Sequence, residues 1–255
     1  MGPQIHLFRC LEDNVGALIR DSESGACAAV DAPDEAAITQ ALAETGWELT
    51  DCLITHSHWD HVQGVEALKQ RYGCRVVAPA SAGDVAEAAD TIVREGDTIC
   101  VGELAARIWE TPGHCADHIV YHFHADDLLL AGDVLFVMGC GRVFGGDYDS
   151  LFRALERIRA LPDATRVVVG HDYTLANARF AVKADPHNAA LAERLEEAEA
   201  RATGKDLFGL TTIAEEKATN PFLRAHEPAL AEAVGLAGSP PEAVFRALRE
   251  WKNKG

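Results

Sequence analysis

Short apolar runs separated by polar turns dominate the first two thirds of the chain, a pattern typical of β-strands. The runs that predict strands are residues 4–10, 15–20, 26–30, 52–55, 75–78, 98–101, 105–109, 118–123, 128–130 and 166–169. Between them, apolar residues at helical spacing predict one helix that is capped by Asp34 and ends near Gly46, and another over residues 62–72 that is closed by Gly73. Residues 79–97 fit neither pattern. Strands interleaved with helices, without a glycine-rich phosphate loop, indicate layered α/β sheets rather than a dinucleotide-binding fold.

The pattern changes near residue 150, where helical spacing takes over. Predicted helices cover residues 151–161, 174–183, 188–202, 228–234 and 240–252, and the last strand lies between the first two of them. Glycine and proline separate the later helices. We therefore predict two domains, an α/β domain of residues 1–172 and a helical domain of residues 173–255.

Composition narrows the class of protein. Hydrophobic residues make up 48% and charged residues 25% of the chain, ordinary values for a soluble globular protein. The net charge of -17 disfavours a nucleic-acid partner, because phosphate binding needs a basic face. No apolar run approaches a membrane span of about 18 residues, and residues 1–9 lack a signal pattern. Seven scattered cysteines without a C-x-x-C pair indicate reduced thiols, so we expect a cytoplasmic protein that does not bind membranes.

The strand at residues 52–55 runs into a loop with four potential metal ligands, His56, His58, Asp60 and His61. In extended backbone His56 and His58 point to the same side, so they can share one ion. Asp60 and His61 lie where the chain turns into the next predicted helix and can reach a second ion. Packing alone gives no reason to crowd four groups that are costly to desolvate. The loop therefore predicts a metal site.

Three further candidate ligands, His114, Asp133 and His171, each follow a glycine near a strand end. Glycine lets the backbone approach an ion closely and adopt turns closed to other residues. The predicted ligand groups are His56, His58 and His114 for one ion and Asp60, His61 and His171 for the other, with Asp133 as the bridge. Imidazole and carboxylate without thiolate suit Zn, Fe(II) or Mn.

Other polar residues near these positions have simpler interpretations. Cys115 follows His114 directly, and a packed thiol is the favoured interpretation over a ligand. His118 is a candidate for orienting a ligand through a hydrogen bond. His122 and His124 alternate along a predicted strand, and we expect them on its polar face.

Together these segments resemble the metallo-β-lactamase superfamily and, within it, glyoxalase II, the hydroxyacylglutathione hydrolases. The resemblance rests on T-H-x-H-x-D-H at 55–61, T-P-G-H at 111–114, A-G-D at 131–133, G-C-G-R at 139–142, G-H-x-Y at 170–173 and N-P-F-L-R at 220–224. It implies a four-layer αββα sandwich and a C-terminal helical domain that helps to hold glutathione. It also implies a dinuclear site for two divalent metal ions, with Zn favoured over Fe or Mn.

The resemblance also implies the residues that hold glutathione. In the family these are a basic and an aromatic residue after the bridging Asp, a tyrosine after the last histidine ligand, and two basic residues of the final helix. The matching residues here are Arg142, Phe144, Tyr173, Arg249 and Lys252. Without the family, the stripe of Arg246, Arg249 and Lys252 is equally well interpreted as a solvated helix face.

Some positions depart from the family pattern. Members often carry Lys and Tyr where this chain has Arg142 and Phe144, and Glu-Gly-Thr where it has Gly145-Gly146-Asp147. A common second histidine of the loop is Ser57 here. None of these positions is a predicted metal ligand. The departures leave open whether the thiol is glutathione or a related thiol.

The implied reaction is hydrolysis of an S-(2-hydroxyacyl)glutathione thioester. S-D-lactoylglutathione would give glutathione and D-lactate in methylglyoxal detoxification. A hydroxide bridging the two ions would attack the thioester carbonyl, with Asp60 and Asp133 as the predicted catalytic residues. We expect a monomer whose partner is this small thioester.

Two alternatives come from other classes of function. One is a persulfide dioxygenase of the same superfamily, with one Fe(II) on His56, His114 and Asp133. The other is a binding module without catalytic activity, which is hard to reconcile with a complete ligand set. The long helical C-terminus and Tyr173 favour the hydrolase over the dioxygenase.

Overall fold

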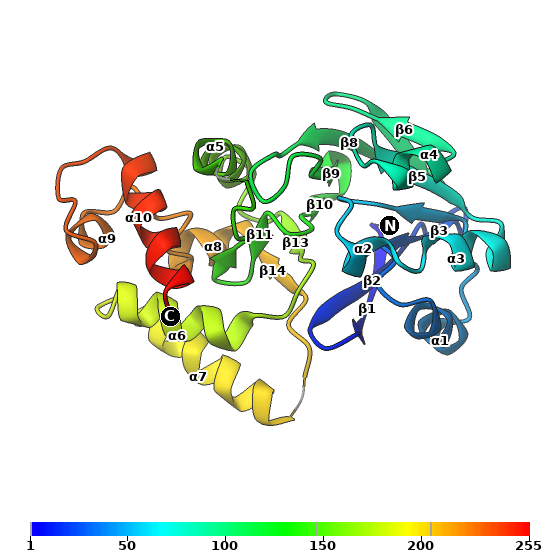
Figure 1. Ribbon diagram of the computed structural model, residues 1–255. Helices are drawn as coiled ribbons and strands as arrows, with labels where there is room; N and C mark the ends of the chain where they lie inside the picture. The colour runs from blue at the N-terminus through cyan, green and yellow to red at the C-terminus, as the bar shows by residue number, and fades with distance from the viewer. Residues whose placement is uncertain (1, 146, 205) are drawn as a thin grey trace.

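The computed structural model describes residues 2–145, 147–204 and 206–255. Gly146, one of the positions that depart from the family pattern, lies outside the described residues. Two β-sheets pack face to face, and helices lie outside both of them (Figure 1). The predicted αββα order of layers is confirmed.

The first sheet comes from the N-terminal part of the chain. In spatial order its strands are β1 (Gln4–Cys10), β2 (Asn14–Arg20), β3 (Cys27–Val30), β4 (Asp51–Leu53), β5 (Arg75–Pro79) and β6 (Thr91–Val93). The first three strands are antiparallel, and β3 to β6 are parallel to one another. Parallel strands end at the same edge of a sheet, and the loop that carries His56 leaves β4 at that edge.

The second sheet is also mixed. In spatial order its strands are β14 (Leu210–Thr212), β13 (Arg166–Val168), β10 (Leu128–Leu130), β9 (Ile119–Phe123), β8 (Leu104–Glu110) and β7 (Thr98–Val101). Its one parallel pair is β10 with β13, and the other neighbours in this sheet are antiparallel. A small hairpin, β11 (Leu135–Phe136) and β12 (Gly139–Cys140), lies beside it.

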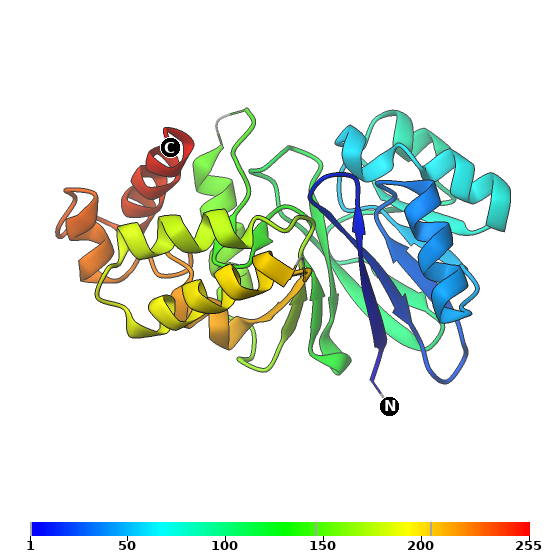
Figure 2. The same ribbon diagram turned by 90° about the horizontal axis from the view of Figure 1, so that it is seen from below.

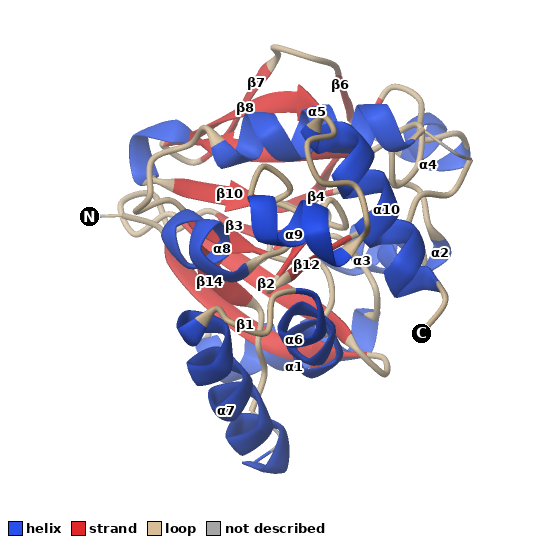
Figure 3. Cartoon of the chain, turned by 90° about the vertical axis from the view of Figure 1, so that its left-hand side faces the viewer, coloured by secondary structure: helices blue, strands red, loops and turns tan. Residues whose placement is uncertain are grey.

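Helices form the outer layers (Figures 2 and 3). The first four helices in the chain are α1 (Glu35–Thr45), α2 (Trp59–Val62), α3 (Val65–Tyr72) and α4 (Asp84–Ala88). A short 3-10 helix spans His124–Asp126. The later helices are α5 (Tyr148–Arg159), α6 (Thr174–Ala184), α7 (Ala189–Gly204), α8 (Ile213–Thr219), α9 (Pro228–Ala233) and α10 (Pro241–Asn253). Figure 2 shows α1 outside the first sheet and the C-terminal helices at the opposite end of the molecule.

The alternation of side chains along each strand builds the layers. In β2, Ala17 and Ile19 face the apolar layer between the sheets, whereas Leu18 faces the layer under α1 and α3. A third apolar layer, which includes Leu151 and Leu248, joins the second sheet to the C-terminal helices. Burying a side chain such as Leu18 stabilises the fold by about 1.5–3 kcal/mol.

One predicted helix is wrong at its start. The predicted helix over residues 62–72 is interrupted after Val62, because Gly64 packs against the loop that follows β3. The Gly64 amide donates to the carbonyl of Ala32 at 2.9 Å, and a Cβ at Gly64 would lie 3.0 Å from that oxygen. The helix before the interruption, α2, begins at Trp59, so Asp60 and His61 lie on a helical turn.

The hydrophobic pattern also misses elements of two to seven residues. It predicts neither the β11–β12 hairpin nor α4 and β6, and it treats the region of β14 and α8 as part of a helical segment. In contrast, α1 begins after Asp34, whose carboxylate accepts from the amides of the first turn, and ends at Gly46 in a left-handed conformation, as predicted.

Two further features bear on the class of protein. No helix in the described ranges combines the length and the apolar character that spanning a membrane requires. The seven cysteines are free thiols, and five of them are buried. Burial raises the pKa of Cys52, so this thiol stays protonated at neutral pH.

Candidate metal centre

The residues predicted as metal ligands gather where loops of the two sheets meet. In chain order they follow β4 (His56, His58), lie on α2 (Asp60, His61), lie between β8 and β9 (His114), and follow β10 (Asp133) and β13 (His171). Because β10 and β13 are parallel neighbours, the last two residues leave the second sheet at one edge. The structure thus brings together side chains more than 100 residues apart in the chain, such as His61 and His171.

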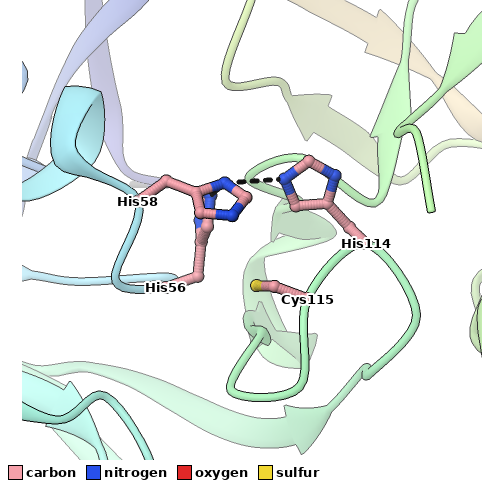
Figure 4. Close-up of side chains that lie close together, drawn as sticks. All are labelled: His56, His58, His114 and Cys115. Atoms are coloured by element: carbon pink, nitrogen blue, oxygen red, sulfur yellow. Dashed lines mark hydrogen bonds between the residues drawn. The ribbon is translucent and has the colours of Figure 1, made fainter. Parts of the chain in front are cut away.

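Three imidazoles form the first group (Figure 4). His58 Nδ1 lies 3.0 Å from His56 Nε2 and 3.0 Å from His114 Nε2. Two nitrogen ligands of one tetrahedral zinc ion lie about 3.4 Å apart, since each Zn–N bond is about 2.1 Å. The spacing of this group is therefore close to that of ligands around a single ion.

The second group combines a carboxylate with two imidazoles. His61 Nε2 lies 3.1 Å from His171 Nε2. Asp60 Oδ2 lies 3.4 Å from His171 Nε2 and 3.7 Å from His61 Nε2. These three ligand atoms lie within 4.8 Å of one another and form a second candidate metal site.

Asp133 lies between the two groups. Its Oδ2 is 3.5 Å from His114 Nε2 and 3.4 Å from His171 Nε2. Its Oδ1 is 3.5 Å from His61 Nε2. One carboxylate thus reaches ligands of both groups, which is the position expected of a bridge.

Hydrogen bonds outside the centre set the tautomer of His56. Thr55 Oγ1 lies 2.9 Å from Asp31 Oδ2 and 2.9 Å from His56 Nδ1. A carboxylate only accepts and a hydroxyl has one proton, so Thr55 donates to Asp31 and accepts from His56 Nδ1. The Nε2 of His56 therefore keeps its lone pair and directs it into the centre.

Three other histidines are held in the same way. Their Nδ1 atoms donate to oxygens outside the centre: His61 to Asp31 at 2.8 Å, His114 to the Arg142 carbonyl at 2.9 Å, and His171 to Asp13 at 2.9 Å. Metal-binding histidines in proteins usually donate their second nitrogen to a carboxylate or carbonyl in this manner. Several Nε2 atoms are thus left with lone pairs that face one another, and a bound cation would accept those lone pairs.

The charge of the centre also fits a cation. Asp133 Oδ1 is buried and has no hydrogen-bond partner in the part of the chain that the structure describes. Burial alone would lower the pKa of His171, but hydrogen bonds to carboxylates, those of Asp133 and Asp60 first, raise it to about 11. Burial opposes the ionised form of Asp60 too, but the hydrogen bond from His171 brings its pKa down to about 2. The carboxylates of the centre thus favour positive charge among the ligand residues.

Two glycines leave room for this arrangement. A Cβ at Gly170 would lie 2.3 Å from Asp133 Oδ1, and one at Gly141 would lie 2.1 Å from the Asp133 carbonyl oxygen. Side chains at either position would displace the carboxylate between the two groups. The residues present therefore fit two metal ions sharing Asp133.

The remaining candidates near the centre have different roles. Figure 4 shows Cys115 beside the first group, and its Sγ lies within ligand spacing of those histidines. Burial and then Asp117 raise the pKa of this thiol, which favours the protonated, packed form. His118 Nε2 accepts the backbone N–H of Asp133 at 3.0 Å, so it is committed to positioning that residue. His122 is half-buried against Trp109, away from the cluster.

The centre opens into a cavity of about 650 Å³. Its lining includes His58, Asp60, His114, Asp133 and His171, and all five residues predicted to hold glutathione. Phe144 is 57% exposed, and its ring packs edge-on against His58 and His114. Tyr173 stacks on His171 with an interplanar angle of 4°.

One wall of this cavity is cationic. Arg249 is buried, donates to the Cys140 carbonyl at 2.8 Å, and leaves its Nε without a partner among the described residues. Lys252 donates to Asn177 and lies near the rings of Phe180 and Phe222. Burial, and then the charge of Arg249, lower the pKa of Lys252 to about 7. No carboxylate in the described residues forms an ion pair with either cation, so this wall favours an anionic ligand.

Sequence reasoning missed the groups that hold the ligands. Asp31 accepts from His61 and from Thr55, and Asp13 and Asn14 contact the second ligand group. Asp31 has a φ of 58°, which is rare for a residue other than glycine. No local motif marks these positions. The only signal is that acidic residues flank strands, with Asp31 directly after β3 and Asp13 directly before β2.

Comparisons with known proteins agree over the whole chain. Residues 29–171 match the family model of the metallo-beta-lactamase superfamily, and residues 172–255 match that of the hydroxyacylglutathione hydrolase C-terminus. The chain is 56% identical over 254 residues to a hydroxyacylglutathione hydrolase of Methylobacterium sp. (strain 4-46), covering 99% of both chains. It is 51% identical over 255 residues to one of Rhodopseudomonas palustris (strain BisA53), covering 100% of both.

A solved structure supports the same assignment of the fold. The crystal structure of ETHE1 from Myxococcus xanthus is 27% identical in sequence and superposes with a TM-score of 0.69, covering 97% of this chain and 91% of that one. The two chains thus share their fold over nearly their whole length. Given the matches to both family models and the identity to full-length relatives, the chain belongs to the hydroxyacylglutathione hydrolases of the metallo-β-lactamase superfamily.

Proposed function

We propose that this protein hydrolyses S-(2-hydroxyacyl)glutathione thioesters to glutathione and a 2-hydroxy acid. S-D-lactoylglutathione, which gives D-lactate in methylglyoxal detoxification, is the expected substrate. The observation that carries the proposal is that one cavity joins two candidate metal sites to a wall formed by the basic residues Arg249 and Lys252. The hydrolases to which the chain is 51–56% identical act, by their names, on the same class of compound.

His56, His58 and His114 would hold one divalent ion, and Asp60, His61 and His171 the other, with Asp133 shared. Zinc suits this imidazole and carboxylate set best, and Fe or Mn would also fit it. When bound, such a pair of ions supplies a hydroxide nucleophile at neutral pH and polarises the carbonyl that it attacks.

The chain's own residues contribute orientation and proton handling. The hydrogen bonds from Thr55, Asp31, Asp13 and the Arg142 carbonyl fix the rings of the ligand histidines before substrate arrives. Asp60 lines the cavity, and its low pKa keeps it ionised, as a metal ligand should be; its second predicted role is to manage the proton as the thioester is cleaved. The leaving thiol has a pKa of about 8–9, so its thiolate departs without a general acid.

The cationic wall would bind the glutathione part of the substrate. Glutathione carries carboxylates at both ends, and the buried Arg249 and the partly buried Lys252 have no carboxylate partner among the described residues. Arg142 is exposed at the mouth of the cavity, where it can reach a carboxylate that extends into solvent. Phe144 and Tyr173 present aromatic surface on either side of the ligand groups.

The proposal is tested by S-D-lactoylglutathione hydrolysis on protein whose metal content is measured in the same sample. We expect rapid loss of the thioester and about two ions per chain, as in other two-metal hydrolytic sites. Oxygen consumption with glutathione persulfide and one iron per chain would instead identify the dioxygenase alternative. Neither activity, with metal bound, would identify a binding module.

We also propose how the chain divides into domains, where the protein acts and that it is a monomer. Residues 1–172 would form the catalytic domain and residues 173–255 the helical domain that holds glutathione. The protein would act in the cytoplasm as a monomer. Light scattering after size exclusion should then give a mass near 27.4 kDa, and a mass of twice that value would contradict the monomer.

A further inference from the structure

The turn between β1 and β2 reaches the second ligand group from outside. Asp13 Oδ1 accepts from His171 Nδ1 at 2.9 Å. Asn14 Nδ2 donates to the backbone carbonyl of Asp60 at 3.1 Å and to its Oδ2 at 3.3 Å. Two adjacent residues, Asp13 at the end of the turn and Asn14 at the start of β2, therefore contact both an imidazole and a carboxylate of the same group.

The backbone holds this turn in register with the end of β13. The Val15 amide donates to the Gly170 carbonyl at 2.8 Å, and the Asp172 amide donates to the Asp13 carbonyl at 2.9 Å. Asn14 pairs with His171 as an isolated antiparallel bridge and is 3% exposed. The turn is thus anchored on both sides of His171, so the two side chains are positioned before an ion binds.

The outer partners of the two ligand groups differ in charge. In the second group, His61 and His171 donate to the carboxylates of Asp31 and Asp13. A ring that donates to a carboxylate becomes a more basic ligand through its other nitrogen, and the added negative charge attracts a cation. The second group also contains a carboxylate of its own, Asp60.

The first group has neutral outer partners. His56 donates to the hydroxyl of Thr55, and His114 donates to the Arg142 carbonyl. Its three ligands, apart from the shared Asp133, are uncharged imidazoles. The negative charge around the centre is therefore concentrated on the side of the Asp13–Asn14 turn.

We propose that the Asp13–Asn14 turn positions His171 and Asp60, and that it makes the site of Asp60, His61 and His171 the tighter of the two metal sites. This inference rests on the proposed two-ion centre. Asp13 and Asn14 act through the ligands and do not themselves bind the ions. The two sites then fill in order, the second group before the first.

The test is a zinc titration of the metal-free full chain against a chromophoric chelator, which yields two binding constants. Asp13→Asn keeps the size of the side chain and removes its charge. We expect the tighter constant to weaken about 10- to 100-fold, the usual effect of losing an outer-shell partner, while the looser constant changes little. Asp13→Glu keeps the carboxylate and should restore most of the tighter constant, and Asn14→Ala should weaken the same constant.

Glu12→Gln is the matched control, because Glu12 is exposed in the same turn and its loss removes the same charge. It should leave both constants nearly unchanged. An Asp13→Asn protein that binds two ions with an unaltered tighter constant, or with only the looser one weakened, overturns the inference and leaves the proposed hydrolase in place. Wild-type protein that binds fewer than two ions overturns the two-ion centre itself, and the inference with it.

Discussion

Arg249 and Lys252 are the side chains that we propose to determine the choice of thiol. Both lie on α10 and line the cavity, where Arg249 is buried and Lys252 is partly buried. Substituting either by Ala should raise KM for S-D-lactoylglutathione more than it lowers kcat, because it removes binding common to the ground and transition states. A hydrogen bond to a charged group contributes about 1.5–3 kcal/mol, so we expect KM to rise about 10- to 100-fold.

Arg246→Ala is the control for that measurement. Arg246 lies on the same helix, but its guanidinium stacks over Tyr148 and pairs with Glu250 away from the cavity. Steady-state kinetics should therefore show an unchanged KM for Arg246→Ala and a raised KM for Arg249→Ala and Lys252→Ala. A loss of kcat at constant KM in Arg249→Ala would mean that the thiol lies elsewhere.

Lys252 should also couple glutathione binding to proton uptake. Burial first, and then Arg249 and Arg142, lower its pKa to about 7, whereas the nearby Cys140 thiol has the opposite effect. Free Lys252 is thus largely neutral at pH 8. A bound carboxylate stabilises the ammonium form, so the pKa rises on binding and the protein takes up a proton.

Calorimetry of glutathione binding at pH 8 in two buffers of different ionisation enthalpy measures that uptake. The apparent enthalpy should differ between the buffers, and the affinity should fall as pH rises above about 7. Lys252→Met should abolish the difference. An enthalpy in the wild type that is independent of buffer would show that Lys252 does not change its charge on binding.

Some functional residues can be predicted from sequence because their signal is local. Four candidate ligands lie within residues 56–61, and His114, Asp133 and His171 each follow a glycine that the geometry requires. Asp31 and Asp13 carry no such signal. Each is defined by a hydrogen bond across 30 and 158 positions of the chain, respectively, which only the fold brings together.

At the scale of elements, α8 connects the C-terminal region to the wall of the cavity. Glu216 on α8 is fully buried, and it accepts from the Met138 amide and the Asn220 side chain at 2.8 Å each. Arg194 pairs with it at 3.0 Å. The Met138 amide belongs to the turn between β11 and β12. Strand β12 ends at Cys140, whose carbonyl accepts a hydrogen bond from Arg249.

Glu216→Ala should therefore lower the free energy of unfolding by about 3–5 kcal/mol, because it takes the carboxylate from the partly buried Arg194 and the acceptor from the buried Met138 amide. Urea denaturation followed by circular dichroism measures the loss. Glu232→Ala removes an exposed carboxylate from α9 and should change stability by less than about 0.5 kcal/mol. Equal effects of the two substitutions would contradict the structural role of Glu216.

Element boundaries show where pattern reasoning ends. Helix α1 is predictable because Asp34 and Gly46 cap it through contacts within a few residues. The break between α2 and α3 is not, because it follows from Gly64 packing on the Ala32 carbonyl. Strand β14 has three residues, too few for a period, and it exists because β13 offers an edge for pairing.

The whole molecule is organised so that its two sheets meet at the candidate metal centre. One set of ligands follows strand β4 of the first sheet, and another follows β10 and β13 of the second. Bound ions would thus link the two sheets as well as serve the reaction. Without ions, carboxylates and imidazoles lie next to one another at the interface between the sheets.

Metal removal should therefore destabilise the whole chain and not only inactivate it. An ion present at a thousand times its dissociation constant stabilises the folded state by about 4 kcal/mol. For a chain of this size each kcal/mol corresponds to about 2–4 °C, so removing the ions with a chelator should lower Tm by roughly 10 °C or more. Scanning calorimetry before and after dialysis against chelator measures the shift, and re-added zinc should reverse it. An unchanged Tm after complete removal would mean that the sheets hold the ligands in place without help from the ions, and that the centre contributes to catalysis alone.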